Sequence, residues 1–362
     1  MNMSTIIASV ALLLGATGSA DQPMKNPKQP PQREPLSQGL EIPEKRFPPG
    51  YNAPACTDTS GWNVDVWGSF TYWNVNQEHM SVAVVPLTPS PIAANVQNGI
   101  IVDVEDTWAP GFKCGIASNI HYDGWVGSAE YTWVRSSTSV SGSNADGQLP
   151  NGYLNTSLYM GPFLRMDEFV SKWKMHLDLL DLLFSRPCYE GTRLAVTPFA
   201  GLRALWIRQR QTLNFVRNVP LASYFALAKS HCWSIGPAAG ISGHWLLGKG
   251  FRFEGSTAGS LLYTRYTTIS AKTKAPNLLP NLGRVTNVNT LRPTAELGIG
   301  MGWSSYFCNQ KYLIDFSARY DFKYFWAQNM GRWFTSSITA FQGNAIGALM
   351  VHGLTLSGGF DF

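Results

Sequence analysis

The segment YLIDFSARYDFKYFW, residues 312–326, alternates between apolar or aromatic residues and polar ones from Ile314 to Tyr324. Its polar face includes Asp315, Arg319 and Lys323, and aromatic and aliphatic side chains fill the other face. Such period-2 alternation is typical of a β-strand with one apolar and one polar surface. A strand of a soluble sandwich has about half this length, whereas a tilted membrane strand needs about 9–11 residues in lipid and can project beyond it. The segment therefore predicts a strand of a transmembrane β-barrel.

The composition of the whole chain agrees with this prediction. Charged residues make up 14% of the chain and aromatic residues 13%, whereas a soluble domain carries about 25% charged residues. After the first twenty residues, no apolar run reaches the roughly 18 residues of a membrane-spanning helix. The net charge of +5 is mild and forms no Lys/Arg block, which argues against nucleic-acid binding. We therefore expect an all-β fold, an up-and-down antiparallel transmembrane barrel of about 10–12 strands.

The same alternation marks ten segments along the chain. They span 62–75, 110–121, 124–136, 168–184, 192–209, 230–246, 250–267, 290–304, 311–326 and 345–362. The connections between them alternate between long and short, as in barrels with short periplasmic turns and long outer loops. Asp123-Gly124 is a good hairpin turn because glycine accepts positive φ. Two further strands within 80–104 would raise the count to twelve.

The segment VSKWKMHLDLLDLLF, residues 170–184, is ambiguous. Trp173, Leu177, Leu180 and Phe184 fit a helical face about as well as Trp173, Met175 and Leu177 fit a strand face. Its place between two alternating segments, and the even count that it completes, favour a strand.

The first 60 residues differ from the rest. Residues 1–20 hold an apolar run followed by Gly18 and Ala20, which predicts a signal peptide, although no Lys or Arg precedes the run. Residues 21–60 are rich in Pro, Lys, Gln and Glu and are expected to form an extended periplasmic tail. The barrel is then expected to occupy residues 61–362.

The face opposite the aromatic residues is expected to line the barrel interior. The candidate pore-lining residues are Arg203, Arg252, Glu254, Arg292, Glu296, Asp315, Arg319, Asp321 and Lys323. The same rule places Asp65, Lys113, Glu130, Lys172, Lys174, Asp178 and Asp361 inside. Opposite charges on adjacent strands form structural pairs, but rings of charge also line selective pores. Both a water-filled channel and a closed, salt-bridged interior remain open.

Five cysteines in an exported chain leave at least one thiol unpaired within the monomer. Cys56, Cys188 and Cys308 are expected on the periplasmic side, which is kept oxidising, and are the disulfide candidates. Cys114 and Cys232 fall within strands and are expected to be inert.

Other motifs carry little chemistry. Gly298, Gly300 and Gly302 alternate with large apolar residues, so they are expected on one face of a strand and not in a nucleotide-binding loop. The six histidines lack metal-ligand spacing. Ser242 and His244 share a strand face without an orienting third group, which favours a polar lumenal pair over a hydrolase site. We expect no catalytic, cofactor or metal site.

Several stretches resemble a known family. APGFKCGIASNIHYDGWVGSAEYTWVRSS is similar to the PGFK, DGW and YTW run of the Legionella-type major outer membrane proteins, pore-forming proteins also found in Chlamydia-like bacteria. RPCYEGTRLAVTPFAGLRALWIRQ, LRPTAELGIGMGWSSYF and SARYDFKYFWAQNM resemble the same family in the same order. The resemblance implies an outer-membrane barrel that passes small solutes, without catalytic residues. It also implies a strand at 168–184.

We therefore expect an outer-membrane porin for passive diffusion of small hydrophilic solutes, with no cofactor. The alternative is a structural or adhesive surface barrel whose outer loops contact the host or the envelope. Phe360 and Phe362 alternate outward at the C-terminus and resemble the signal that barrel-assembly machinery recognises. The expected partners are outer-membrane lipid, that machinery and small solutes. Disulfide-linked or homo-oligomeric partners remain open.

Overall fold

The computed structural model describes residues 64–86, 99–120, 124–143, 153–154, 167–190, 193–218, 221–274, 281–308, 312–330 and 346–362. The expected signal peptide, the periplasmic tail and Cys56 lie outside these residues. No helix in these ranges is long and apolar enough to cross a membrane.

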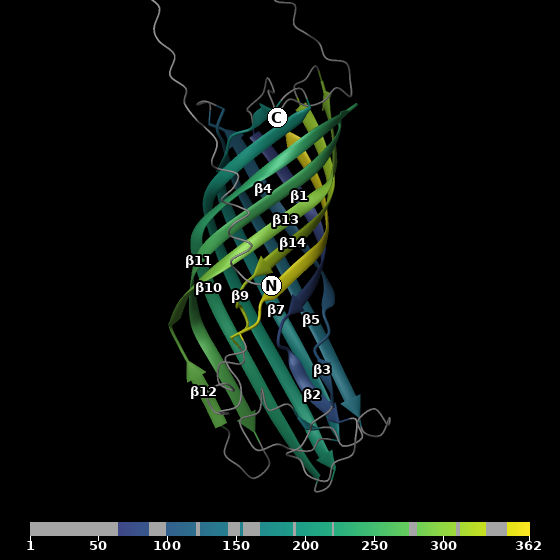
Figure 1. Cartoon of the computed structure of the whole chain (residues 1–362), viewed down its shortest axis with the longest axis vertical. Helices are drawn as coiled ribbons and strands as arrows, with labels where there is room; N and C mark the ends of the chain where they lie inside the picture. Colours follow the sequence, from purple (N-terminus) through teal and green to yellow (C-terminus); the bar gives the residue numbers. More distant parts are fainter. Residues whose placement is uncertain are drawn as a thin grey trace, which may run out of the picture. The chain divides into compact units, whose positions relative to one another are not determined.

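Within the described residues, ten antiparallel strands close into a barrel (Figure 1). The barrel strands are β1 (Val64–Gln77), β4 (Thr107–Asn119), β5 (Val126–Ser143), β7 (Glu168–Ser185), β9 (Leu194–Asn218), β10 (Leu221–Gly248), β11 (Phe251–Lys274), β13 (Val288–Phe307), β14 (Tyr312–Phe325) and β15 (Leu349–Asp361). Each of the ten expected segments overlaps one of them, and neighbours in this order pair all the way round. The predicted fold is confirmed, and the segment at 168–184 is strand β7.

The barrel is closed by its first and last strands. Asp65 pairs with Asp361, and the register continues to Gln77 and Leu349. Beyond the last ladder pair, the backbones of Val64 and Phe362 exchange two hydrogen bonds of 3.1 Å. The C-terminus therefore continues the sheet to its final residue, which leaves no free backbone edge at the seam.

Deletion of Phe362 is expected to lower the amount of folded barrel that reaches the membrane. The deletion removes both hydrogen bonds to Val64 and the aromatic contact with Phe360, whose ring centroid lies 5.7 Å away. The measurement is the heat-modifiable band in membrane fractions. Phe362→Tyr, which keeps an aromatic ring and the backbone, serves as control and should assemble normally. Equal band intensities for the deletion and the parent would contradict the expectation.

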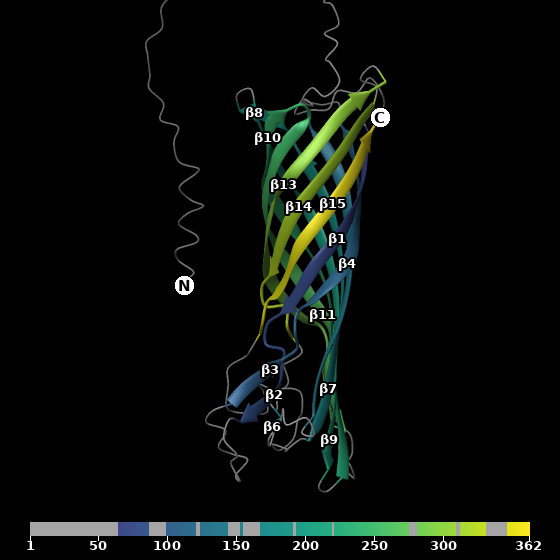
Figure 2. The ribbon, with the colours of Figure 1, turned by 90° about the vertical axis from the view of Figure 1, so that its right-hand side faces the viewer.

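The two ends of the barrel differ. The turn end carries Val64, Phe362 and short connections such as Lys249-Gly250, with φ of 54° and 83°. Gly124 has a φ of 71°, so this glycine adopts the left-handed backbone expected of the turn. At the opposite end, called the loop end, β5, β7, β9, β10 and β11 extend beyond the other strands (Figure 2). Residues 210–229, expected as a loop, instead continue β9 and β10 as a long hairpin.

Residues 80–104 contain the two additional strands that were considered, but these lie outside the barrel wall. β2 (Ser81–Pro86) and β3 (Gly99–Asp103) pair with each other, and β6 (Tyr153–Leu154) pairs with β2. At 6 and 5 residues, β2 and β3 are too short to cross a bilayer, which takes about 9–11. Two further short strands, β8 (Cys188–Glu190) and β12 (Asn281–Val285), pair with β9 and β11.

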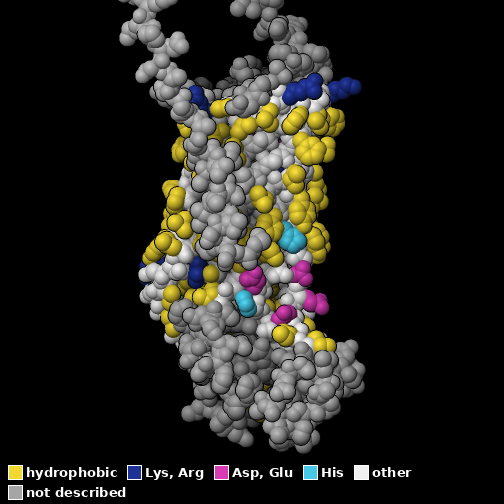
Figure 3. All heavy atoms as spheres, in the orientation of Figure 1, with side chains coloured by type: hydrophobic (Ala, Val, Ile, Leu, Met, Phe, Trp, Pro, Cys, Tyr) yellow, Lys and Arg dark blue, Asp and Glu magenta, His cyan; other side chains and the backbone are white. Residues whose placement is uncertain are grey.

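The outer surface of the barrel is apolar, as lipid contact requires. Exposed aromatic and aliphatic side chains cover it, as Figure 3 shows for one side. The interior is divided along the axis. Charged and hydroxyl side chains fill it toward the turn end, and an apolar cluster fills it toward the loop end. This cluster includes Val75, Phe169, Trp173, Met175, Leu177, Leu205, Ile207, Leu213, Phe215, Tyr266 and Phe325.

Candidate functional site

All nine candidate pore-lining residues lie on inward faces of the barrel. Eight of them form ion pairs with one another or with further inward residues. The ninth, Arg292, lies nearer the loop end, where its guanidinium contacts Met330 Sδ at 3.5 Å and the Tyr266 ring at 6.0 Å. Their function as a pore lining stays a prediction.

Arg203 forms two buried ion pairs in the interior. Its guanidinium donates to both carboxylate oxygens of Asp181, at 2.7 and 2.8 Å, across the β7 and β9 ladder. The same guanidinium reaches across the lumen to Glu296, which also accepts from Lys323 Nζ at 2.5 Å. Arg203 is only 3% exposed. Four charges from four strands therefore tie opposite walls of the barrel together.

A second group of ion pairs surrounds Asp321. This carboxylate accepts from Lys113 Nζ at 3.1 Å, from Arg319 at 2.8 Å and from the Thr355 hydroxyl at 2.7 Å. Lys113 Nζ also lies 3.9 Å from Glu130. Buried carboxylates need such partners because desolvation of an unpaired charge is costly.

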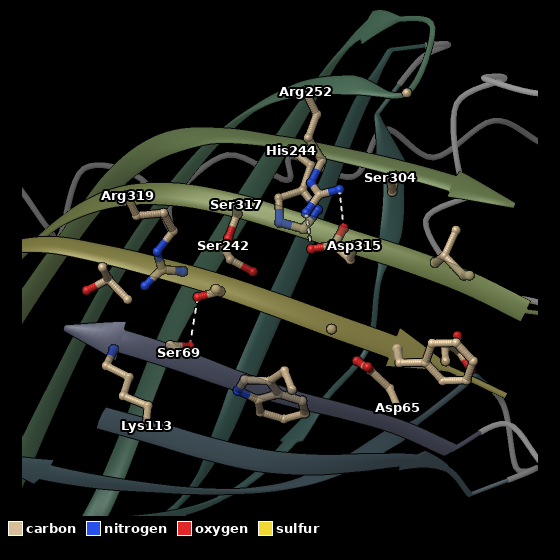
Figure 4. Close-up of a pocket in the computed structure, with 18 of the residues that line it drawn as sticks. Asp65, Ser69, Lys113, Ser242, His244, Arg252, Ser304, Asp315, Ser317 and Arg319 are labelled. Atoms are coloured by element: carbon tan, nitrogen blue, oxygen red, sulfur yellow. Dashed lines mark hydrogen bonds and ion pairs between the residues drawn. The ribbon is translucent and has the colours of Figure 1, made fainter. Parts of the chain in front are cut away.

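A third group lies nearer the turn end, where Figure 4 shows its side chains meeting inside the barrel. Arg252 contacts Glu254 at 2.6 Å and Asp315 at 2.5 Å, which come from β11 and β14. His244 lies opposite Glu254 in the β10 and β11 register and lines the same space.

Glycines on the inward face of β13 make room for these side chains. A Cβ atom at Gly298 would lie 2.8 Å from Ser256 Oγ and 2.9 Å from Asp321 Oδ1. A Cβ atom at Gly302 would lie 2.7 Å from Arg252 Cζ. The alternation of glycine with large apolar residues thus gives a smooth lipid surface outside and space for ion pairs inside.

The charged groups border two cavities that share part of their lining. The larger one has a volume of about 460 Å³ and is lined by residues that include Asp65, Lys113, Arg252, Asp315 and Arg319. A smaller one, of about 230 Å³, is bordered by the Arg203 group and also touches Lys113 and Arg319. At about 30 Å³ per water molecule, the larger cavity has room for on the order of ten waters. The polar part of the lumen is therefore a chamber and not a solid core.

Trp73 belongs to the apolar cluster and contacts residues that line the chamber. The indole is 1% exposed, and its Nε1 donates to the Thr355 hydroxyl at 3.1 Å. Lys113 Nζ lies 5.1 Å and Lys323 Nζ 6.0 Å from the centre of the ring, within cation–π distance. Two ammonium groups and one hydroxyl of the polar interior therefore lie against this single indole.

The expectation that Lys172, Lys174 and Asp178 face the interior is wrong. The first two are exposed on the outside of β7, and Asp178 pairs there with Arg135 at 2.8 Å. Near the loop end the outer face of the wall is polar, while its inner face packs in the apolar cluster. The polarity of the two faces is therefore reversed, and Asp181, the main partner of Arg203, was missed because it shares a face with Met175 and Leu177.

The other candidate groups are placed as follows. Ser242 and His244 both face the chamber, and the Ser242 hydroxyl donates to the Thr197 carbonyl oxygen at 3.4 Å. Cys188 and Cys308 carry free, exposed thiols, so no bond joins these two disulfide candidates. In the part of the chain that the structure describes, Cys114 and Cys232 are also free, the latter buried.

The fold is similar to those of solved outer-membrane barrels. The outer membrane protease OmpT from Escherichia coli is 8% identical, with 84% of this chain and 98% of that chain covered at a TM-score of 0.39. The translocator domain of the autotransporter NalP from Neisseria meningitidis is 8% identical, with coverages of 84% and 90% and a TM-score of 0.35. The toluene transporter TodX from P. putida is 8% identical, with coverages of 86% and 92% and a TM-score of 0.29. Similarities this distant assign neither an activity nor a substrate to this chain.

The family relationship comes from the sequence. No curated protein matches the chain. The family model of the Legionella pneumophila major outer membrane protein precursor matches residues 54–361, which include every strand of the barrel. This match confirms the resemblance seen in the sequence and gives the location of the barrel. The chain is an outer-membrane protein that belongs to the Legionella major outer membrane protein family.

Proposed function

We propose that this barrel is a narrow porin through which small hydrophilic solutes and ions diffuse passively, and that the structure describes a closed form of it. The observation that carries the proposal is the charged chamber inside the barrel, whose residues Lys113 and Thr355 contact Trp73 of the apolar cluster. A barrel that served only as a wall could be filled with apolar side chains at equal or greater stability, because ion pairs gain little over well-packed apolar groups. The lumenal charges are better explained by water and solutes that pass among them.

The width of the barrel limits the proposed traffic. Barrels of eight strands are filled by their own side chains, while those of 16–18 leave a broad channel. Ten strands lie near the lower end, so we expect a small unit conductance and no passage of large solutes. Movement of Trp73 and of its apolar neighbours is the opening step in this proposal.

Planar-bilayer recording of the refolded full-length chain tests the proposal. We expect brief, small current steps. Arg252→Glu, which reverses a charge on the chamber wall, should shift the reversal potential in a salt gradient toward cation preference. A matched reversal at the exposed turn residue Lys249, Lys249→Glu, should shift it less, because solvent screens that site. Complete silence of the parent chain under all voltages would overturn the porin proposal.

One observation favours a second function, a structural or adhesive surface protein. Strands β5, β7, β9, β10 and β11 rise beyond the apolar band, and the sheet of β2, β3 and β6 lies at the same end (Figure 2). Silent bilayers together with binding of the folded barrel to host cells or envelope components would favour this function.

We also propose an orientation. The loop end faces outward and the turn end faces the periplasm, by analogy with barrels that have short periplasmic turns. Residues 21–60, which precede Val64 at the turn end, would then form a periplasmic tail. The barrel-assembly machinery would meet Phe360 and Phe362 from the same side. Protease added to intact cells should leave an epitope placed within residues 21–60 uncut, and cleavage of that epitope would contradict the orientation.

A further inference from the structure

Four neighbouring strands carry aligned rows of side chains on their outward faces near the loop end. The first row consists of Trp133 on β5, Asp178 on β7, Trp206 on β9 and Trp233 on β10, which are direct cross-strand partners. Toward the turn end, the same outward faces carry apolar residues such as Leu182 and Leu202, 46% and 53% exposed. Aromatic girdles mark the boundary between hydrocarbon and head groups. The tryptophan row therefore marks the outer limit of the lipid-facing surface.

The next two rows toward the loop end are basic. Arg135, His176, Arg208 and His231 are cross-strand partners in one row, and Ser137, Lys174, Arg210 and Lys229 in the next. Lys174, Arg208 and Arg210 are exposed, and Lys229 is partly so. We call Lys174, Arg208, Arg210 and Lys229 the basic ladder.

Acidic partners are nearly lacking there. Asp178 is the one carboxylate among the residues of these three rows, and both of its oxygens accept from Arg135, at 2.8 and 3.0 Å. Over the described ranges, no member of the basic ladder forms an ion pair.

This arrangement is unfavourable without a bound anion. Adjacent strands are about 4.8 Å apart, and like charges directly opposite each other are destabilising. In the second basic row, Lys174, Arg210 and Lys229 are consecutive cross-strand partners. Their position, two to four residues beyond the tryptophans, places them about 7–13 Å farther along strands tilted by about 40°, which is about 5–10 Å above the hydrocarbon boundary. This is the depth of lipid head groups and their phosphates.

We propose that the basic ladder binds the phosphate groups of anionic glycolipids in the outer leaflet. Arg and Lys form charge-assisted hydrogen bonds with phosphate oxygens, and guanidinium groups bind them in a bidentate manner. The acyl chains of the same lipid lie against the apolar face that includes Leu182, Leu202 and Trp206. The site depends on the proposed orientation but not on conduction through the barrel, so the two proposals can fail separately.

Native mass spectrometry of the folded full-length chain in neutral detergent, titrated with diphosphoryl lipid A, tests the proposal. The ladder variant is Lys174→Gln/Arg210→Gln. The matched control is Arg193→Gln/Lys249→Gln, which removes one Lys and one Arg from exposed positions at the turn end. We expect the ladder variant to bind about 10- to 30-fold more weakly, given the attraction of two basic side chains to an anionic lipid surface. The control should bind like the parent chain.

Three further measurements test whether the phosphate groups of the lipid are what is bound, whether a soluble polyanion binds instead, and whether the ladder variant is folded. The same lipid without its phosphates should bind no better to the parent than to the ladder variant. In lipid-free detergent the ladder variant should unfold at the same or a higher temperature than the parent, because like charges have been removed. Equal lipid A binding by parent and ladder variant, or equal losses in ladder and control variants, would overturn the proposal. So would binding of a soluble polyanion such as heparin at the ladder in the absence of any lipid A binding, which would identify a soluble partner instead.

Discussion

Trp73→Ala is expected to increase the ionic conductance of the barrel several-fold and to lengthen its openings. In the proposed closed form the indole is the barrier between the chamber and the loop end, and its replacement by a methyl group leaves a gap beside Lys113 and Lys323. Water that enters this gap is stabilised by the two ammonium groups and by the freed Thr355 hydroxyl. The water-filled part of the lumen would then extend farther toward the loop end, and the apolar segment that blocks ions would become shorter.

The same substitution has a cost in stability. Replacement of a buried Trp by Ala destabilises soluble proteins by about 3–5 kcal/mol. Because a polar chamber borders the new gap, hydration should bring the loss toward the lower end of that range. Trp206→Ala is the matched control. This substitution also removes an indole, but Trp206 is 40% exposed on the lipid side and does not contact the chamber. Equal currents through both variants and the parent chain, in planar bilayers, would show that Trp73 is not a barrier.

Arg203→Gln is expected to destabilise the folded barrel by about 3–5 kcal/mol, the usual effect of breaking a buried ion pair. Asp181 would lose both of its hydrogen bonds from the guanidinium and remain 5% exposed with an unpaired charge. Glu296 would keep Lys323 as a partner, so most of the loss should arise at Asp181. The measurement is urea unfolding of the refolded barrel, followed by tryptophan fluorescence.

The outer face supplies a second Arg–Asp pair as a control, in which the guanidinium also donates to the carbonyl oxygens of Val134 and Leu177. Arg135 binds Asp178 through two hydrogen bonds across β5 and β7, but these side chains are 27% and 19% exposed. Arg135→Gln should therefore cost about 1 kcal/mol or less. Adding Asp181→Asn to Arg203→Gln should recover part of the loss, because the double variant no longer buries an unpaired carboxylate. Equal losses for Arg203→Gln and Arg135→Gln would mean that the lumenal ion pairs are as well solvated as those outside.

The strand pattern could be predicted because lipid imposes one rule on the outer face of the barrel. Segments such as 312–326 alternate cleanly, since hydrocarbon lies on one side and polar groups on the other. The rule ends where the strands leave the membrane. In β7, Lys172 and Lys174 lie on the outer face beyond the hydrocarbon while Trp173 and Met175 pack inside, so the inside and outside assignments reverse within one strand. A period of two is the same in both regions, and no local signal marks the change.

The ends of β9 and β10 were missed for a related reason. Residues 210–229 contain alternating positions, Leu213 and Phe215 among them, but their apolar face points inward. The predicted strand therefore ends at residue 209, and residues 210–229 are interpreted as a loop. The extended hairpin follows from packing against the apolar cluster, which the sequence of these strands alone does not reveal.

The inward-facing residues of the candidate site could be predicted from the sequence, but the contacts between them could not. Each of the nine pore-lining candidates faces inward, because the apolar residues next to it in sequence face the lipid. Which charges meet depends on register and on the distance across the lumen, as between Arg203 on β9 and Glu296 on β13. Trp73 was not among the candidates, since an aromatic residue in a barrel strand is normally assigned to the girdle.

Closure of the sheet by β1 and β15 also governs how the chain reaches its folded state. Asp65 and Asp361, which are partners at the seam, are 296 residues apart in sequence (361 minus 65). From the time β1 is made until β15 arrives, its outer edge presents unpaired amide and carbonyl groups that any other strand can occupy. Two processes then compete during folding. Closure of the barrel is slow because the contacts are so distant in sequence, and the rate of edge pairing with a second copy increases with protein concentration. The yield of native barrel should therefore fall steeply when the chain is produced faster than its last strand can find its first.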